Sequence, residues 1–524
     1  MQIDFDIALP TLLIALLALT IPWLNPFANG PSASVVPWLT SLACISLFLV
    51  WAQFRRIDSA SVAAGTWLAA AAVSSVIGLF QYYGASVAFS PWVNSAKLGE
   101  AFANLRQRNQ FATLTNMGLA ALLWCITCRG LPSLEEATHS AIPAVPPKFP
   151  PAWSLAAAAL LAVGNAASSS RTGLLELVLL AGMLLVWGCF KQPGVRCVML
   201  AAGLAYCVAV IALPRLAGLD LASNGMLARL HDGAPACASR LTLWGNVLHL
   251  IAQKPWFGWG WGELDYAHFM TLYPGPRFCD ILDNAHNLPL HLAVELGLPV
   301  ALLLCGLGVW LVWRSEPWRE ANPTRQMAWA VLALIMLHSM LEYPLWYGPF
   351  QIATALCIWL LWSTGWLVHA DSAGTGKRHN EHVAGQSRLA KRVAGCLSLL
   401  MLAGVAYAGW DYHRVSQIYL APNMRSPAYR ENTLEKIGAS WLFHNQVRFA
   451  ELTTTEVTVD NAAHINALAH DLLHFSPEAR VAEKLIDSAV MLGRDDEARL
   501  HLARYRAAFP VEHAQWVKGK ELPF

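Results

Sequence analysis

Charged side chains are scarce in this 524-residue sequence, and their scarcity argues against a soluble protein. Only 13% of the residues are Asp, Glu, Lys or Arg, while 56% are hydrophobic. A soluble globular chain carries about 25% charged residues. The net charge is only +2, and no basic stripe or nucleic-acid motif occurs, so no nucleic acid is expected as a partner. No phosphate-binding glycine loop is present either, so nothing in the sequence predicts a nucleotide or another cofactor.

The hydrophobic residues instead fall in blocks long enough to cross a membrane, which takes about 20 residues per helix. The mean hydropathy is +0.41. We therefore predict an all-α polytopic membrane protein with about 11 transmembrane helices. The expected spans are 8–24, 35–53, 62–83, 110–128, 152–167, 172–190, 195–213, 288–313, 326–343, 348–369 and 393–410.

Lys and Arg in the short loops predict the orientation, because loops on the cytoplasmic side are enriched in them. Arg55, Arg56 and Lys148 are among the basic residues that place one set of loops in the cytoplasm. The long loop then lies outside, in the periplasm of an inner-membrane protein. We expect four parts: N-terminal transmembrane helices (1–213), a periplasmic loop (214–287), C-terminal transmembrane helices (288–410) and a periplasmic helical, tetratricopeptide-like domain (411–524).

The long loop contains two of the eleven cysteines, Cys237 and Cys279. In an oxidising compartment they could pair, and the sequence leaves this open. The tail contains a probable turn at Gly493-Arg494 between two amphipathic helices. One such helix pair cannot bury its own face, so it must pack on a neighbour. It would serve either to dock an acceptor or to stabilise the fold.

Two groups of arginines stand at the predicted outer ends of spans. The first group is the run Arg106-Gln107-Arg108-Asn109 before residue 110, and the second is Arg171 between two spans. Free N–H groups at a helix start favour anions, and the guanidinium fork fits a phosphate. Alternatively, these arginines anchor to lipid headgroups at the membrane interface.

Two further groups lie in or beside the long loop. Arg240 begins an amphipathic stretch that continues into a tryptophan-rich run containing Trp259. That indole would belong to the interfacial aromatic belt, or it would offer a flat face to a sugar or isoprenoid. His286 and Asn287 lead into the next span. An accessible His286 could act as a general base, although a lone histidine is more often structural. Asp280 and Asp283 could bind a cation or simply orient His286.

The last group lies near the end of the span 326–343. His338 and Glu342 are four residues apart and share a helix face. A glutamate at membrane depth needs a cationic partner, for which the arginines are the candidates, and a purely structural ion pair is the alternative interpretation. Together the groups gather arginines, a histidine and a glutamate at one membrane face. That combination suits transfer of a sugar from a lipid diphosphate sugar to an alcohol.

These segments resemble, in order, the motifs of the bacterial O-antigen ligase and polymerase superfamily. The closest similarity is to the PglL-type protein O-oligosaccharyltransferases, which glycosylate pilin. The run His338-Ser-Met-Leu-Glu-Tyr343-Pro-Leu-Trp-Tyr347 favours that branch. Where relatives begin the first cluster with His, this chain has Asn104, so a direct role of that position is in doubt. The segments that match are Arg106–Asn109, Ser170–Thr172, Arg240–Trp244 with Phe257–Trp261, Ala285–Asn287 running to Gly297, and His338–Tyr347.

The resemblance implies a donor, an oligosaccharide on undecaprenyl diphosphate, and an acceptor, a Ser or Thr hydroxyl of a protein such as type IV pilin. It implies His286 as the essential histidine, and Arg171 and Arg240 as contacts of the diphosphate, with no metal or cofactor. Glu342 would position an arginine or the histidine. The remaining substrate-binding candidates are Arg106, Gln107, Arg108, Asn109, Asn287, His338, Tyr343 and Trp259.

Two rival functions remain. An O-antigen ligase or polymerase would use the same chemistry on a sugar hydroxyl. A polysaccharide transporter would carry its polar residues near mid-membrane rather than at one face.

Overall fold

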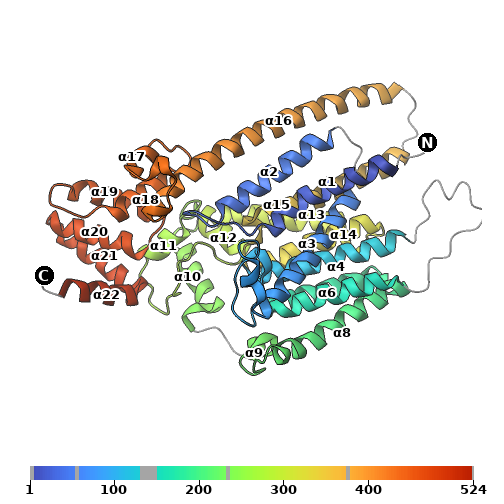
Figure 1. Cartoon of the computed structure of the whole chain (residues 1–524), viewed down its shortest axis with the longest axis horizontal. Coiled ribbons are helices and arrows are strands. Elements are labelled where there is room, and N and C mark those ends of the chain that lie inside the picture. The colour runs from blue at the N-terminus through green and yellow to red at the C-terminus, as the bar shows by residue number, and fades with distance from the viewer. Residues whose placement is uncertain (1–4, 54–57, 130–149, 232–235, 373–377, 522–524) are drawn as a thin grey trace, which may run out of the picture. The chain divides into compact units, whose positions relative to one another are not determined.

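The computed structural model describes residues 5–53, 58–129, 150–231, 236–372 and 378–521 (Figure 1). Within these ranges the chain forms helices and no β-strand, as predicted. Arg55, Arg56, Lys148 and Lys377, which contributed to the predicted orientation, lie outside the described residues. The chain divides into two compact units. The bundle unit comprises 1–28, 34–232 and 312–406, and the loop–tail unit comprises 29–33, 233–311 and 407–524.

The bundle unit is built mainly from long apolar helices. Its helices are α1 (Phe5–Leu24), α2 (Val35–Ala52), α3 (Ser59–Tyr82), α4 (Arg108–Arg129), α6 (Ala152–Ser168), α7 (Arg171–Val186), α8 (Pro193–Leu216), α9 (Gly225–His231), α14 (Pro323–Ser339) and α15 (Gly348–Ser372). Short 3-10 turns are η1 (Ala85–Phe89), η2 (Ala103–Leu105), η3 (Cys189–Lys191), η5 (Pro317–Arg319) and η6 (Pro344–Trp346).

The core of the bundle unit surrounds α4. This helix lies beside α3, α6, α7 and α14 (Figure 1). Phe111, Leu114 and Met117 of α4 are fully buried among alanines of α3 and α6. Small residues allow helices to approach closely where no water drives apolar surfaces together. In this core, α4 approaches α3 closely at Gly118. A Cβ atom added at Gly118 would lie only 2.4 Å from the methyl group of Ala71, so any larger residue there would push α3 away.

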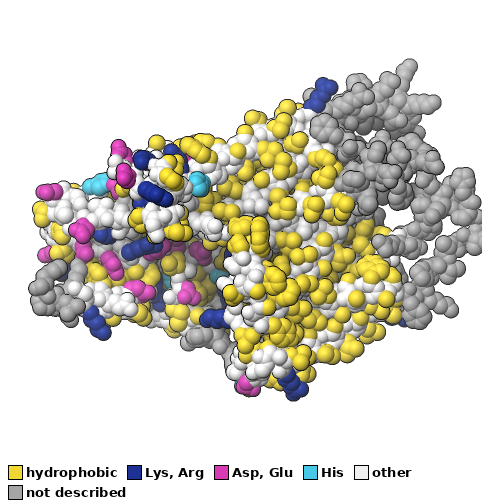
Figure 2. Space-filling view, in the orientation of Figure 1, with side chains coloured by type: hydrophobic (Ala, Val, Ile, Leu, Met, Phe, Trp, Pro, Cys, Tyr) yellow, Lys and Arg dark blue, Asp and Glu magenta, His cyan; other side chains and the backbone are white. Residues whose placement is uncertain are grey.

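Six helices among the described residues are long and apolar enough to cross a membrane. Each of the eleven predicted spans contains helix, but 172–190 is α-helical only to Val186, 326–343 only to Ser339, and the run 288–313 is broken in two by Gly297. Figure 2 shows hydrophobic side chains over the outer surface of the bundle helices. The chain is thus an all-α membrane protein. The six candidate spans are Val35–Ala52, Ser59–Tyr82, Arg108–Cys128, Pro193–Leu216, Leu298–Arg319 and Arg392–Tyr419.

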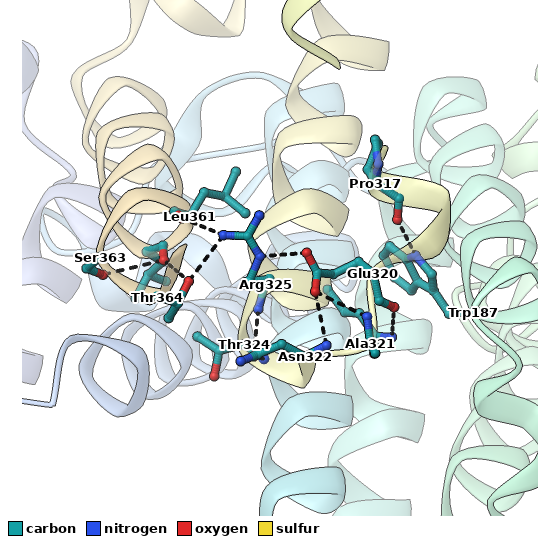
Figure 3. Close-up of polar contacts among 12 residues, drawn as sticks. Trp187, Pro317, Glu320, Ala321, Asn322, Thr324, Arg325, Leu361, Ser363 and Thr364 are labelled. Atoms are coloured by element: carbon teal, nitrogen blue, oxygen red, sulfur yellow. Dashed lines mark hydrogen bonds and ion pairs between the residues drawn. The ribbon is translucent and has the colours of Figure 1, made fainter. Parts of the chain in front are cut away.

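A polar contact group fixes the start of α14 (Figure 3). The side chain of Asn322 caps the helix by accepting from the backbone N–H of Thr324 at 2.9 Å. The guanidinium of Arg325 donates to Glu320 at 2.6 Å and to the carbonyl of Leu361 in α15 at 2.5 Å. Each of these charged groups is thereby paired in a half-buried setting, and α14 and α15 are joined at this end.

The loop–tail unit combines the long loop with the tail. Its helices are α10 (Arg240–Gln253), α11 (Leu264–Met270), α12 (Leu288–Leu296), α17 (Thr433–Ile437), α18 (His444–Thr454), α19 (Ala462–Leu473), α20 (Ala479–Met491), α21 (Asp495–Ala508) and α22 (Pro510–Glu521). Its 3-10 turns are η4 (Ala236–Ala238), η7 (Gln417–Tyr419), η8 (Pro422–Met424) and η9 (Pro427–Tyr429). Two helices cross the boundary between the units, namely α13 (Leu298–Ser315) and α16 (Arg378–Ser416).

The predicted turn at Gly493 is present between α20 and α21, with Gly493 at φ 69°. The apolar faces of α18 to α21 pack together and onto Phe269 of α11. The tail helices therefore find their neighbour in the loop, as a lone helix pair must. Charged side chains gather on the surface of these helices (Figure 2). Cys237 and Cys279 are joined by a disulfide, which closes the loop between η4 and the segment before α12.

Candidate active site

The predicted cluster Arg106–Asn109 forms the entry to α4. Gln107 caps the helix, because its side-chain oxygen accepts from the backbone N–H of Gln110 at 3.1 Å. Arg106 precedes it in the left-handed region at φ 60°, and burial lowers the pKa of its guanidinium. Arg108 is the first residue of the helix and forms an ion pair with Glu100 at 3.3 Å. The positive end of the α4 dipole thus coincides with two arginines.

The loop before α4 is held by buried amides. Gln81 of α3 accepts from the backbone N–H groups of Phe102 and Ala103, at 3.0 and 2.7 Å. Asn104 is 3% exposed and donates to the carbonyls of Leu24 and Trp92, at 2.8 and 2.9 Å. The side chain at position 104 therefore fixes the loop that presents the arginines, which gives this position a structural role.

The start of α7 is tied directly to the start of α4. Ser170 caps α7 by accepting from the backbone N–H of Gly173 at 3.0 Å, and its hydroxyl donates to the side chain of Asn109 at 2.6 Å. Arg171, the first residue of α7, is exposed and forms no ion pair with other described residues. Two helix N-termini with their free N–H groups, each carrying an arginine, consequently lie side by side.

A third arginine, which the sequence pattern did not single out, lies close enough to Arg108 and Arg171 to interact with them electrostatically. Arg229 of α9 is half-buried, and burial, together with repulsion from Arg108 and Arg171, lowers the pKa of its guanidinium to about 10. Its Nη1 atom is buried and has no hydrogen-bond partner among the described residues. Glu100, which pairs with Arg108 and also acts on Arg229, is one carboxylate beside three guanidinium groups, so the group carries excess positive charge that suits a further anion. We call Arg108, Arg171 and Arg229 the arginine cluster.

The predicted His338 and Glu342 lie at the end of α14 and reach the same helix starts. Glu342 is 6% exposed, and its carboxylate accepts from the side-chain amide of Asn109 at 3.2 Å. The backbone N–H of Glu342 donates to the carbonyl of His338 at 2.8 Å, which continues the helical turn past Ser339. Asn109 thus connects Ser170 to Glu342, and three of the predicted motifs meet at one side chain.

One to two turns further along α4 from Asn109, there is a polar network that the sequence analysis did not predict. The hydroxyl of Thr113 lies 2.6 Å from Glu176 Oε1 and 2.8 Å from Nδ1 of His338, and Asn116 donates to Glu176 Oε2 at 3.0 Å. Glu176 and His338 are both fully buried. Thr113 can donate to Glu176 and accept from the Nδ1–H group of His338, while Nε2 of His338 has no hydrogen-bond partner among the described residues. We call Thr113, Asn116, Glu176 and His338 the buried network.

A sequence signal for this network was available. Glu176 is the only acidic residue in the predicted span 172–190, where a carboxylate is costly unless it serves a purpose. Asn109, Thr113 and Asn116 follow the i, i+4, i+7 spacing of one helix face. Polar residues that share a face inside an apolar helix indicate a polar interface.

The loop–tail unit holds the other predicted residues. Ser239 caps α10 by accepting from the backbone N–H of Thr242 at 3.2 Å, so Arg240 is the first residue of that helix. One turn later, the indole of Trp244 donates to the carbonyl of Ala285 at 3.2 Å. Arg240 and the segment carrying His286 therefore belong to neighbouring parts of one core.

The backbone at His286 adopts a conformation that histidine rarely takes. Its φ is +50°, in the left-handed region, and its N–H donates to Asn284 Oδ1 at 2.9 Å. Asn284 is 3% exposed, and its side-chain N–H₂ has no hydrogen-bond partner among the described residues. Strained backbone and unpaired buried donors occur together at functional sites. Asn287 then caps α12 by accepting from the backbone N–H of Leu290 at 3.1 Å.

The tryptophan-rich run packs against the break between α12 and α13, and we call this contact the clasp. The backbone N–H of Trp259 donates to the carbonyl of Val294 at 2.9 Å, and that of Gly260 donates to Glu295 at 3.0 Å. A Cβ on Gly258 would lie 2.3 Å from the carbonyl oxygen of Glu295, so only glycine fits. The indole of Trp259 donates to the carbonyl of Leu250 at 3.0 Å, with Lys254 Nζ 4.0 Å above the ring.

The structure thus groups the predicted site residues into two sets. The bundle unit brings together Arg108, Asn109, Arg171, His338 and Glu342, with Gln107 as the helix cap. The loop–tail unit brings together Arg240, His286, Asn287 and Trp259 on α10, α12 and the segments before α12. Tyr343, at the entrance to η6, stacks on Tyr347 with ring centroids 6.0 Å apart.

Comparison with known proteins agrees with the motifs. Residues 156–305 match the O-antigen ligase family, residues 326–522 match the C-terminal part of virulence factor membrane-bound polymerases, and residues 101–124 match the protein glycosylation ligases. The fold and these matches define a multi-pass membrane protein with helical spans. These matches support the predicted resemblance to the superfamily of O-antigen ligases and PglL-type protein glycosylation ligases.

Two curated relatives come from Acinetobacter baylyi. A general O-oligosaccharyltransferase is 29% identical over 133 residues, which is 25% of this chain and 22% of that protein. A ComP-specific O-oligosaccharyltransferase is 24% identical over 260 residues, which is 49% of this chain and 43% of that protein. The chain therefore matches less than half the length of each of these relatives.

Proposed function

We propose that the chain is a glycosyltransferase that moves a preassembled oligosaccharide from undecaprenyl diphosphate to Ser or Thr hydroxyls of periplasmic proteins such as type IV pilin. Support comes from the two curated relatives, which are named as O-oligosaccharyltransferases. The proposed setting is the inner membrane, with about 11 spans and with the long loop and the tail in the periplasm.

The observation that carries this proposal is the arginine cluster at the paired starts of α4 and α7. The cluster joins Arg108 and Arg171 to Arg229, and repulsion from the first two lowers the pKa of Arg229. Preorganised cations and helix N-termini stabilise a diphosphate most where its charge increases, which is at the leaving group. A site built this way favours departure of undecaprenyl diphosphate.

In the proposed reaction, His286 accepts the proton of the acceptor hydroxyl as the oxygen attacks the anomeric carbon. The bond between that carbon and the diphosphate oxygen breaks, and the electron pair leaves with the diphosphate. Attack and departure on opposite faces invert the anomeric carbon in one step. The left-handed backbone at His286, held by Asn284, aims the imidazole and is the strained feature expected of a catalytic residue.

The other residues take supporting roles. Arg171 and Arg240 neutralise the departing diphosphate, while Arg106 and Arg108 hold the headgroup of the donor. Glu342 acts through Asn109, whose side chain bridges it to the capping hydroxyl of Ser170. Asn284 supports the site by holding the backbone N–H of His286. Trp259 contributes by fixing the loop through Leu250 rather than through a free ring face.

A second acceptor class has specific support. One matching family is the O-antigen ligases and another is described as membrane-bound polymerases, so a sugar hydroxyl is the alternative acceptor. Both acceptors use the same donor chemistry. Loss of glycan from pilin with unchanged surface polysaccharide, after deletion of the gene, distinguishes the protein acceptor from the sugar acceptor.

The test is glycan transfer in a reporter strain that expresses a pilin acceptor, with protein level and folding checked by blotting and limited proteolysis. His286→Ala should reduce transfer by roughly 100-fold or more, as removal of a general base does. The matched control is His444→Ala, an exposed histidine in the same unit. Near-normal transfer by His286→Ala at normal protein level would remove the base assignment.

The cationic half of the site is tested in parallel. Arg171→Ala should reduce transfer by roughly 10- to 1,000-fold, while Arg196→Ala, an exposed arginine near the start of α8, should leave it unchanged. Equal activity of both variants would contradict the role of the arginine cluster.

A further inference from the structure

A second group of chemically capable side chains lies outside the proposed active site, on the tail helices. His470 of α19 and Glu497 and His501 of α21 each offer a potential metal-ligand atom, and these three atoms all lie within 4.8 Å of one another. Among the described residues, neither Asp280 nor Asp283 belongs to such a group. The expectation of a cation at those aspartates thus has no geometric support, whereas the tail offers an alternative that the sequence pattern did not suggest.

The three side chains are brought together by the packing of α19 and α21 through α20. Glu497 and His501 are four residues apart and so share one face of α21, and His470 meets them from α19. The imidazole Nε2 of His470 lies 2.7 Å from Glu497 Oε1, and the rings of His470 and His501 are 5.5 Å apart. Two helices thereby supply two nitrogens and one carboxylate to the same point.

The residues around Glu497 hold it in place as outer partners of a metal ligand do. The side-chain amide of Asn466 donates to Glu497 Oε1 at 3.0 Å. Asn466 is itself 2% exposed and is oriented by Arg494, which donates to its oxygen at 2.7 Å. Ligating carboxylates are commonly hydrogen-bonded in this way, which fixes their direction.

Two independent features point to a ligand. His501 is 3% exposed, yet its Nδ1 atom has no hydrogen-bond partner among the described residues. All three side chains also line one open cavity of about 540 Å³, which Tyr266, His474 and Arg504 help to enclose. A small ion can therefore reach the group from solvent, and a fourth position can be filled by water or by a partner's side chain.

We propose that His470, Glu497 and His501 bind a divalent transition-metal ion, of which Zn²⁺ fits best. Two imidazoles and one carboxylate are the ligands of open three-coordinate protein zinc sites. Ligand atoms around tetrahedral zinc lie roughly 3.3 Å apart, given bonds of about 2.0 Å. The buried His501 provides a fixed point, and the exposed His470 needs only a small rotation to complete the set. The ion would tie α19 to α21 and stabilise the tail.

The experiment uses the full-length protein, purified in detergent and stripped with a chelator. Zn²⁺ is titrated by calorimetry, and Co²⁺ is added as a spectroscopic probe of tetrahedral coordination. The unmodified protein should bind one Zn²⁺ that His470→Ala and His501→Ala lose, with affinity reduced at least 10-fold. His464→Ala is the matched control, because His464 forms a similar pair with Glu451 at 2.9 Å but has no third ligand.

Thermal unfolding provides the second measurement. Ligands that bind only the folded state raise its melting temperature, so Zn²⁺ should raise that of the unmodified protein and of His464→Ala but not of His470→Ala. The exposed position of His470 makes this variant the one expected to fold normally. Equal Zn²⁺ affinity in the unmodified protein and His470→Ala, or no binding by either, would overturn the proposal. Neither result bears on glycan transfer, which is measured separately.

Discussion

The amide of Asn109, at the start of α4, donates to the carboxylate of Glu342, just past the end of α14, at 3.2 Å. The two residues are 233 positions apart in the sequence. The oxygen of the same amide accepts from Ser170 at 2.6 Å. Because an amide has both a donor and an acceptor end, Asn109 can join a carboxylate to a hydroxyl where neither Asp nor Leu can.

Replacement of this bridge should lower activity more than stability. Asn109→Ala removes both hydrogen bonds at a half-buried position, with a cost of about 1–3 kcal/mol to folding. We expect glycan transfer to fall at least 10-fold, because Arg108 and Arg171 lose the connection between their helix starts. Asn109→Asp should fare worse, since it sets a second carboxylate against Glu342. Transfer assays on protein matched for expression test both variants, and unchanged activity in Asn109→Ala would show that the bridge is dispensable.

Glu176 should stabilise the bundle unit. Glu176→Leu removes one hydrogen bond each from Thr113 and Asn116, which keep their bonds to the backbone carbonyls of Asn109 and Gly173, so the cost is about 1–3 kcal/mol in total. We expect the melting temperature of the purified protein to fall by several degrees. Glu176→Gln keeps the shape and one acceptor oxygen, so its loss should be smaller. Leu177→Ala on the same helix serves as the comparison for a simple loss of packing, and an equal or larger effect there would weaken the case for the network.

Much of this site was predictable from the sequence because its parts are local. Helix starts at Arg108, Arg171 and Arg240 follow from caps at Gln107, Ser170 and Ser239 that act within three residues. Arg229 was missed because its role depends on α9 packing beside two distant helix starts. The buried network was missed for the same reason, since Glu176 acquires meaning only when α4 and α14 lie beside α7.

The break at Gly297 was likewise outside the reach of hydropathy, which predicted one continuous helix across 288–313. Gly297 has φ +84°, and a Cβ there would lie 2.2 Å from the carbonyl oxygen of Trp256. The break exists because a segment 40 residues earlier pushes its backbone against it. Hydropathy averaged over consecutive residues cannot detect a contact with a distant segment.

Replacement of Gly297 or Gly258 by alanine should disrupt the contact between the tryptophan-rich run and the break between α12 and α13. Gly297→Ala and Gly258→Ala both place a methyl group against backbone atoms at 2.2–2.3 Å, in addition to requiring a left-handed conformation. We expect loss of transfer and faster proteolysis within residues 254–298 in either variant. Gly306→Ala on α13 meets no atom within 4 Å and should behave normally. Normal cleavage patterns in both clasp variants would contradict the close approach.

Acid should destabilise the loop–tail unit through His268. This residue is 3% exposed, and burial, with a smaller effect of Arg277, lowers its pKa from 6.5 to about 3. Because the unfolded chain binds a proton between these values and the folded chain does not, stability falls as pH drops from 6.5 toward 3. His268 alone contributes a loss of about 2 kcal/mol by pH 5, and Asp265, whose pKa burial raises to about 7, opposes it.

Hydrogen exchange of peptides covering 264–278 measures this loss. His268→Gln removes the titrating group, so its protection should change less between pH 7 and pH 5 than that of the unmodified protein. His464→Gln, at an exposed position, should show the unmodified pH dependence. A pH dependence that is identical in His268→Gln would exclude His268 as its source.

The most direct measurement combines the purified protein with undecaprenyl diphosphate-linked oligosaccharide and a pilin acceptor, and follows both products by mass spectrometry. Glycosylated acceptor and free undecaprenyl diphosphate should form in equal amounts, with the anomeric configuration inverted, and neither should form with His286→Ala. Acceptor glycosylation that persists in His286→Ala, or no transfer by the unmodified protein under conditions in which an established oligosaccharyltransferase is active, would contradict the proposed reaction.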